Sequence, residues 1–293
     1  MSVLINWAQF QNLRYVPPAG GPGSGVRWDE HAVMYAKMAE LERDYTPHQV
    51  AAIPCRATDT VLDIGCGPGR LTVPMARRAA SVTAMDSSPK MLAGCAAACE
   101  AAGVGNVTTL PLDWHDAVAG GNVDRHDVVV CSRTAALDDL ERLSGFARKR
   151  VAIVLWANAP SIPPILDRLF AGAQEQRLGA APGHRAVRAL SYNVSFNVAY
   201  DLGYEPNVAI VPDGFARTFA SAEEQYDYLR DLRPMAAGPA AEAAFRANAD
   251  RFTTIAPDGS RTFRIETRSV VLWWDVRRPD YSEIWDHPAG APG

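Results

Sequence analysis

A glycine-rich turn between a predicted strand and a predicted helix is the segment best suited to bind a ligand. Residues 60–64 form a short apolar run, and Gly65, Gly67 and Gly69 follow it at alternate positions. Glycine lets the backbone turn sharply and lets a ligand approach the chain closely. Dinucleotide-binding turns have the spacing Gly-x-Gly-x-x-Gly, but Arg70 occupies the place of their third glycine. The spacing therefore counts against NAD and FAD.

Two carboxylates stand near the ends of the next two predicted strands. Asp86 ends the second strand, where its side chain can accept hydrogen bonds from both ribose hydroxyls of an adenosine. Asp113 follows the third strand and can accept a hydrogen bond from the exocyclic amine of adenine, with Trp114 or Met85 against the adenine ring. The alternatives are that Asp86 only caps the helix that follows Ser88, and that Asp113 is a solvated loop acid.

The segments that carry these residues alternate between predicted strands and helices. Runs 127–131 and 151–156 are continuously apolar, which is typical of parallel strands covered on both faces. Strand-helix alternation predicts an α/β fold with a doubly wound sheet, and such sheets bind ligands at the carboxyl ends of their strands. Further strands at 207–211 and 269–276 complete a mostly parallel, seven-stranded, Rossmann-like sheet with a helical and aromatic insertion after the fifth strand.

The motif Asp-Ile-Gly-Cys-Gly-Pro-Gly at 63–69, with the two acids behind it, resembles the class I S-adenosylmethionine-dependent methyltransferases. The resemblance is strong over residues 28–156, and residues 202–208 resemble a bacterial subgroup of the small-molecule type. It implies S-adenosylmethionine as cofactor and S-adenosylhomocysteine as product. The implied cofactor site consists of Tyr35, Asp63, Gly65, Cys66, Gly67, Gly69, Asp86, Ser87, Met91, Asp113, Trp114 and Ser132. The alternatives are that the glycines form a purely structural turn and that Tyr35 is an ordinary core tyrosine.

The cofactor of this family carries a sulfonium, so methyl transfer is an in-line displacement that depends mainly on positioning. A catalytic base is optional, and none is assigned. His115 and His31 are weak candidates, and exposed histidines are the alternative.

The acceptor should lie beyond the carboxyl ends of the fourth and fifth strands. We expect a pocket formed by Arg133 and Trp156, with Tyr192 and Tyr200 from the insertion. The insertion is then a lid over the acceptor, although a cover for the sheet or a dimer contact is equally compatible with its composition.

The chain divides into four predicted parts. An N-terminal arm and Pro/Gly-rich linker span 1–25, and the S-adenosylmethionine-binding core spans 26–160. The insertion, or lid, spans 161–204, and the rest of the sheet with its flanking helices spans 205–293.

Composition excludes several functions. The net charge of -4 and the lack of a basic stripe argue against a nucleic-acid partner. The sequence contains no run of about 18 apolar residues, so it predicts no membrane span. The five cysteines form no C-x-x-C pair, so we expect no metal and a reducing cytoplasm.

The sequence thus predicts a methyltransferase that acts on a small-molecule substrate, as a monomer or a homodimer. A non-catalytic S-adenosylmethionine-binding protein is the first alternative. A nicotinamide-dependent oxidoreductase is the second, which Arg70 disfavours.

Overall fold

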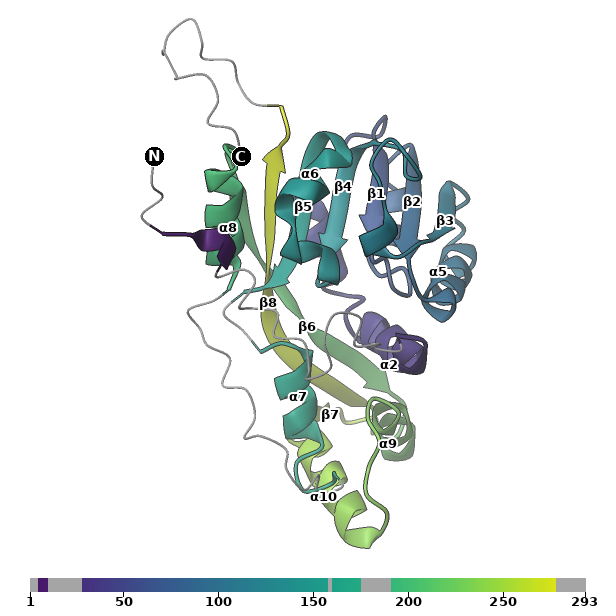
Figure 1. Cartoon of the computed structure of the whole chain (residues 1–293). Coiled ribbons are helices and arrows are strands. Elements are labelled where there is room, and N and C mark those ends of the chain that lie inside the picture. Colours follow the sequence, from purple (N-terminus) through teal and green to yellow (C-terminus); the bar gives the residue numbers. More distant parts are fainter. Residues whose placement is uncertain (1–4, 10–27, 158–159, 175–190, 278–293) are drawn as a thin grey trace, which may run out of the picture.

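A single mixed sheet organises the chain in the computed structural model, which describes residues 5–9, 28–157, 160–174 and 191–277 (Figure 1). The strand order is β3-β2-β1-β4-β5-β8-β6, with β7 paired to β8. Strands β1 to β5 are mutually parallel, and β8 runs antiparallel to β5, β6 and β7. The strands are β1 (Thr60–Ile64), β2 (Ser81–Asp86), β3 (Val107–Pro111), β4 (His126–Ser132), β5 (Ala147–Trp156), β6 (Asn207–Phe219), β7 (Thr253–Ile255) and β8 (Arg261–Asp275). The predicted α/β, mostly parallel, Rossmann-like sheet is confirmed, and β7 is an eighth strand that was not predicted.

Helices cover both faces of the parallel part of the sheet. In the part of the chain that the structure describes, the helices are α2 (Trp28–Leu41), α3 (Thr46–Ala52), α4 (Thr72–Ala76), α5 (Pro89–Ala101), α6 (Leu140–Gly145), α7 (Ile162–Leu169), α8 (Tyr192–Asp201), α9 (Ala222–Arg230) and α10 (Pro239–Asp250). Leu140 of α6 and Val198 of α8 pack on one face, and Val50 of α3 and Met75 of α4 pack on the other. This two-sided cover explains why the central strands are continuously apolar.

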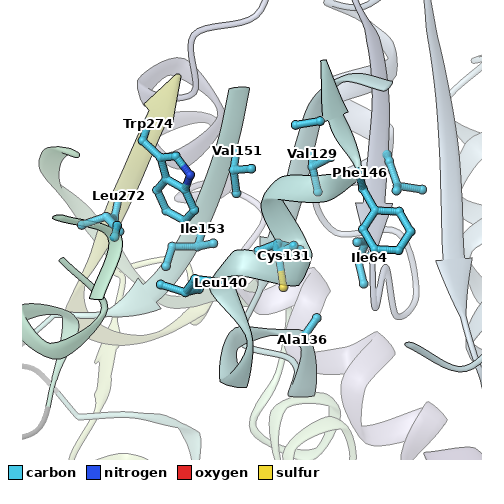
Figure 2. Close-up of a cluster of buried hydrophobic side chains, with 14 of the residues drawn as sticks. Ile64, Val129, Cys131, Ala136, Leu140, Phe146, Val151, Ile153, Leu272 and Trp274 are labelled. Atoms are coloured by element: carbon cyan, nitrogen blue, oxygen red, sulfur yellow. The ribbon is translucent and has the colours of Figure 1, made fainter. Parts of the chain in front are cut away.

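The face under α6 and α8 forms the largest buried cluster, part of which is shown in Figure 2. Val129, Ile153 and Trp274 are fully buried there. Trp274 donates its indole N–H to Ser144 Oγ at 3.0 Å, so its one polar atom is satisfied. Burying one such aliphatic side chain contributes about 1.5–3 kcal/mol, so this cluster fixes the strands on which the site is built.

Strands β6 and β8 extend beyond the parallel sheet as a long antiparallel arm (Figure 1). With α7, α9, α10 and part of α2 they bury a second cluster, which includes Phe215, Phe219, Phe245 and Phe263. The sequence prediction covered only the continuously apolar ends of these strands. Residues 263–268 alternate between buried or half-buried and exposed positions, as expected for a strand with one solvated face.

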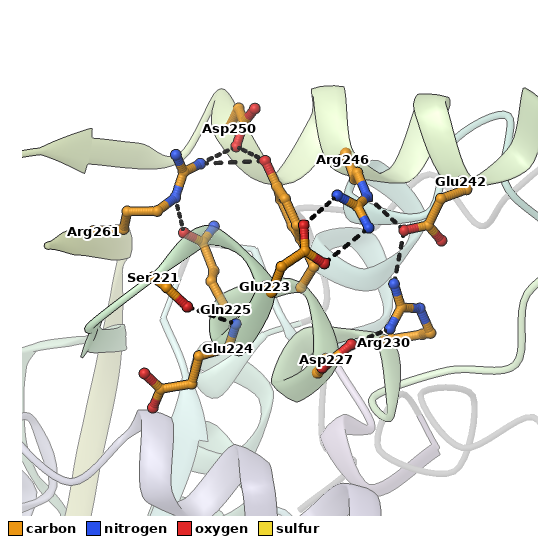
Figure 3. A network of polar contacts seen from close by, with 11 residues as sticks. Ser221, Glu223, Glu224, Gln225, Asp227, Arg230, Glu242, Arg246, Asp250 and Arg261 are labelled. Atoms are coloured by element: carbon orange, nitrogen blue, oxygen red, sulfur yellow. Dashed lines mark hydrogen bonds and ion pairs between the residues drawn. The ribbon is translucent and has the colours of Figure 1, made fainter. Parts of the chain in front are cut away.

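Polar contacts join the helices of this arm (Figure 3). Arg246 pairs with Glu223 at 2.8 Å and with Glu242 at 2.6 Å, which ties α10 to α9. Ser221 caps α9, because Glu224 N donates to Ser221 Oγ at 3.2 Å, and the Glu224 carboxylate in turn accepts from Ala220 N at 2.8 Å. Half-exposed ion pairs of this kind each contribute little, so the arm depends mainly on its apolar cluster.

Most of the predicted N-terminal arm lies outside the described residues. Within 5–9, Trp7 packs against the cluster under α6 and α8. Among the helices that the structure describes, none combines the length and the apolar character needed to cross a membrane.

Candidate cofactor and acceptor site

A cavity of about 330 Å³ opens at the carboxyl ends of the parallel strands. It lies around the boundary between β1 and β4, where the strand order reverses. Ligands bind at such reversal points in open α/β sheets. Residues that follow β2 and β3 line one half of the cavity, and residues that follow β4 and β5 line the other, with α2 and the start of α7 completing the wall.

The glycine turn after β1 lies in this cavity. Gly65 N and Cys66 N both donate to the Met85 carbonyl, at 2.8 and 3.0 Å, which fixes the turn against β2. Gly67 has a φ of +54°, and no described atom lies within 4 Å of the place where a Cβ would stand. The turn therefore leaves an open cradle at Gly67, as close approach of a ligand requires.

The other two glycines allow close packing within the protein. A Cβ at Gly65 would lie 2.5 Å from Thr134 Cγ2. A Cβ at Gly69 would lie 3.1 Å from the Cys95 sulfur and 3.2 Å from its Cα. Gly69 does not line the cavity. Its prediction as a cofactor contact is wrong, because its missing side chain makes room for α5.

Asp86 and Asp113 both border the cavity but are held differently. The Asp86 carboxylate accepts from Gly67 N and from Ser88 N, each at 2.9 Å, and burial raises its pKa. Ser88, and not Asp86, caps α5, because its hydroxyl accepts from Met91 N at 3.1 Å. Asp113 is 46% exposed and pairs with His115 Nδ1 at 2.8 Å. Burial raises the pKa of Asp113, but its hydrogen bonds with His115 outweigh this and lower it.

Asp63 lies deepest in the cofactor half. It is fully buried, accepts a 2.7 Å hydrogen bond from Thr72 Oγ1, and burial raises its pKa to about 6. Arg70, the residue that breaks the dinucleotide pattern, lies beside it with its side chain 13% exposed. Its guanidinium donates to Gln49 at 2.6 Å and to Ser132 Oγ at 2.7 Å. Arg70 therefore fills space that a dinucleotide-binding glycine would leave open.

Arg133 links both halves of the cavity to the antiparallel arm formed by β6 and β8. Its φ of +56° is unusual for a residue with a side chain. The guanidinium pairs with Glu42 at 2.9 Å and with Asp213 at 2.6 Å, and it donates to Ser269 Oγ at 2.8 Å. Its carbon lies 3.3 Å from the centroid of the Trp156 ring. Arg133 borders the cavity as predicted, but its terminal nitrogens are already engaged by protein groups.

Helix α2 forms a roof over the cavity and is attached at several points. Near its start, Asp29 accepts from the Ser88 hydroxyl. Along the helix, Lys37 pairs with Asp231 at 2.6 Å and Glu40 pairs with Arg217 at 2.6 Å. These contacts join α2 to α5, α9 and β6, and α2 places Tyr35 along the cavity. The Trp28 ring packs edge-on against the Tyr35 ring, with their centroids 6.0 Å apart.

The predicted lid over the acceptor is only partly supported. Tyr192 packs against the cluster under α6 and α8, and Tyr200 is 64% exposed; neither lines the cavity. Their prediction as acceptor contacts is wrong, because α8 covers the sheet beside β8 and α6 instead. From the insertion, Ile162 and Pro163 at the start of α7 do line the cavity. Residues 175–190, which belong to the same predicted lid, lie outside the described residues.

The two histidine candidates differ in position. His115 borders the cavity but is 67% exposed and bonded to Asp113. His31 is exposed on α2 and does not line the cavity, so its candidacy as a base is wrong. Within the described ranges, no group of three or more His, Cys, Asp or Glu side chains is arranged to hold a metal ion.

Of the predicted site residues, those placed along the cavity are Tyr35, Asp63, Gly65, Cys66, Gly67, Asp86, Ser87, Met91, Asp113, Trp114, Ser132, Arg133 and Trp156. Sequence reasoning missed a further set that shares this wall, namely Trp28, Met38, Glu42, Arg70, Leu112, Thr134, Ile162 and Pro163. Glu42 had a usable signal, because it follows Tyr35 by seven residues and so continues the same helix face. Arg70 was noted only as the departure from the dinucleotide spacing, and the other six were not singled out by any chemical motif.

Comparisons with known proteins agree with this geometry. Residues 61–151 match the family model of a methyltransferase domain. An uncharacterized protein of Haemophilus influenzae is 35% identical over 131 residues, which cover 43% of this chain and 48% of that protein. A ribosomal RNA small subunit methyltransferase A of Magnetococcus marinus is 28% identical over 182 residues, which cover 59% of this chain and 58% of the relative. The chain thus spans about half the length of the curated relatives it matches.

Solved structures of methyltransferases are also similar. The S-adenosylmethionine-dependent methyltransferase of Thiobacillus denitrificans, in complex with S-adenosyl-L-homocysteine, is 16% identical, with 83% of this chain and 96% of that chain covered and a TM-score of 0.49. The magnesium protoporphyrin IX methyltransferase of Synechocystis, with bound S-adenosylhomocysteine, is 17% identical over 93% of this chain and 92% of that chain, with a TM-score of 0.41.

The matched residues form a methyltransferase domain that contains the glycine turn, Asp86 and Asp113, the features from which the sequence predicted a class I S-adenosylmethionine-dependent methyltransferase. The cofactor of this class is S-adenosylmethionine. The cavity fits such a molecule, because the cradle at Gly67 is open and the Asp86 and Asp113 carboxylates border it as acceptors for hydroxyl and amine donors. Trp114 and Met91 supply apolar surface beside these acids for an adenine ring.

Proposed function

We propose that this chain transfers the methyl group of S-adenosylmethionine to a small-molecule acceptor. The observation that carries this proposal is the division of one cavity into two chemically different halves. Acidic groups and the glycine turn line the half after β1, β2 and β3, and aromatic and aliphatic side chains dominate the half at β5, α2 and α7. Donor and acceptor then meet at the boundary between β1 and β4.

The bound cofactor supplies a sulfonium, which makes its methyl carbon electrophilic without further activation. The chain itself positions the cofactor and the acceptor and excludes water from between them. Asp86, held rigid by two backbone N–H groups, orients the hydroxyl donors of the nucleoside. Met38 and Trp156 of the other half give the acceptor a wall that does not hydrate its nucleophile.

The acceptor must bring its own lone pair. Among the ionisable side chains described along the cavity, Glu42 pairs with both Arg70 and Arg133. His115 is bonded to Asp113 and largely exposed. A group that is already nucleophilic near neutral pH, or that loses its proton to water, suits this site, and we assign no catalytic base.

The negative net charge and the acids of the cavity favour a small molecule over a nucleic-acid acceptor. The experiment is to incubate the protein with S-adenosylmethionine and a metabolite panel and to measure S-adenosylhomocysteine by mass spectrometry, with Asp86→Ala as the matched control. Turnover with one panel member that the control lacks supports the proposal. Tight cofactor binding with no turnover of any acceptor would favour the non-catalytic alternative.

A further inference from the structure

Resting on the proposed function, we infer that the acceptor is an uncharged aromatic molecule that binds against the Trp156 indole at the β5 end of the cavity. The inference comes from the composition of this half. Its wall combines Trp156 with Met38 of α2 and with Ile162 and Pro163 of α7. Flat apolar surfaces of this kind bind flat apolar ligands.

The Trp156 ring is held in place by two neighbouring side chains. The Arg133 guanidinium carbon lies 3.3 Å from its centroid, and the buried Phe215 ring lies 6.0 Å away at an interplanar angle of 41°. The indole is nevertheless half-exposed and borders the cavity. An aromatic ring fixed in this way loses little freedom when a ligand packs on it, which favours binding.

The charges beside Trp156 cancel. Arg70 and Arg133 carry two positive charges, and Glu42 and Asp213 carry two negative charges. Arg133 uses its two terminal nitrogens on Glu42, Asp213 and Ser269. The carboxylates are almost fully buried, at 1% exposure for both Glu42 and Asp213.

A charged acceptor would disturb this balance. The Arg133 Nε atom has no hydrogen-bond partner but is itself buried. An anion could therefore reach the Arg133 guanidinium only by displacing a buried carboxylate, which would then be left unpaired at high cost. A cation would lie next to two guanidinium groups. An uncharged acceptor leaves every pair intact, so the network selects against charge at the same time as Trp156 selects for a flat ring.

Three probes that share a naphthalene ring and carry a neutral, an anionic or a cationic substituent test the inference: 2-naphthol, 2-naphthoate and 2-naphthylmethylamine. Their binding is measured by fluorescence and calorimetry at neutral pH, with the protein saturated by S-adenosylhomocysteine. We expect 2-naphthol to bind at least tenfold more tightly than either charged probe. Trp156→Ala should weaken the binding of 2-naphthol at least tenfold, and Trp156→Phe should bind 2-naphthol with an affinity within threefold of the wild type.

Trp273→Ala is the matched control, because Trp273 also has a guanidinium over its ring, that of Arg150 at 4.6 Å, but does not line the cavity. It should leave 2-naphthol affinity unchanged. Tighter binding of 2-naphthoate or 2-naphthylmethylamine would overturn the inference, and so would the absence of naphthol binding to the S-adenosylhomocysteine complex. If the wild-type protein does not bind S-adenosylhomocysteine at all, the proposed function itself is refuted, so the two failures are distinguishable.

Discussion

The two halves of the cavity are built by different means. The cofactor half comes mostly from 63–91, with Asp113 shortly after, and its key contacts are short backbone hydrogen bonds such as Gly67 N to Asp86. The acceptor half gathers Glu42, Arg133 and Asp213 from distant parts of the chain and engages their charges with one another. The difference indicates that the acceptor half can change its ligand through α2, α7 and the arm while the cofactor half stays the same.

Arg133 should matter most to stability, because it neutralises two buried carboxylates. Arg133→Ala leaves Glu42 and Asp213 short of a partner, and we expect a loss of about 3–5 kcal/mol in the free energy of unfolding. Urea denaturation measures it. Arg150→Ala is the matched control, since Arg150 stacks on Trp273 but pairs with a half-exposed carboxylate, and it should cost at most about 1 kcal/mol. Equal losses in the two variants would contradict the buried-network account.

The buried acid of the cofactor half should give a distinct pH dependence. Burial raises the pKa of Asp63 from 3.8 to about 6, so between these values the folded state holds a proton that the unfolded state has released. Its contribution to stability is therefore full below about pH 3.8 and is lost as pH rises through about 6. The total change is about 3 kcal/mol, because each pKa unit corresponds to about 1.4 kcal/mol.

Asp63→Asn removes this titration and keeps an oxygen for Thr72. Relative to the wild type, the variant should thus gain about 3 kcal/mol in unfolding free energy between pH 3 and pH 7, measured by urea denaturation across the range. A stability difference that does not change with pH would show that the Asp63 carboxyl group titrates normally.

Asp86 should be the strongest single contributor to cofactor affinity. Asp86→Ala removes charge-assisted hydrogen bonds worth about 2–3 kcal/mol, which is about 30- to 150-fold in the dissociation constant of S-adenosylhomocysteine. Asp113→Ala should cost less, because Asp113 is 46% exposed and already bonded to His115. Calorimetry on both variants tests this order, and a larger loss in Asp113→Ala would reverse it.

The smallest effects should separate the glycines. Gly67→Ala and Gly69→Ala both place a side chain at positive φ, at a cost of about 1–2 kcal/mol. Only the methyl group added by Gly67→Ala would enter the open cradle, so this variant should bind S-adenosylhomocysteine about tenfold more weakly. Gly69→Ala should lose more unfolding free energy, because its methyl group meets Cys95, and should keep the affinity within threefold. Identical affinities in the two variants would contradict the division of roles.

The sequence predicted the cofactor half better than the acceptor half. The strand-turn-helix pattern around Gly67 and the acid at Asp86 are local, so their positions follow from the order of elements. The acceptor wall depends on which helix packs over the sheet, and composition alone could not distinguish α8, which covers a face, from α7, which borders the cavity. Likewise, residues 212–219 of β6 and 261–268 of β8 are not continuously apolar and were not predicted as strands, which hid the partnership of Asp213 with Arg133.

The central claim is that the half after β1, β2 and β3 binds an adenosylated amino acid rather than a dinucleotide. Titrating S-adenosylhomocysteine and NAD separately into the wild-type protein in a calorimeter tests it most directly. The account predicts one S-adenosylhomocysteine site per chain and NAD binding at least tenfold weaker, because Arg70 lies where a dinucleotide turn needs glycine. NAD binding more tightly than S-adenosylhomocysteine to the folded protein would contradict the claim.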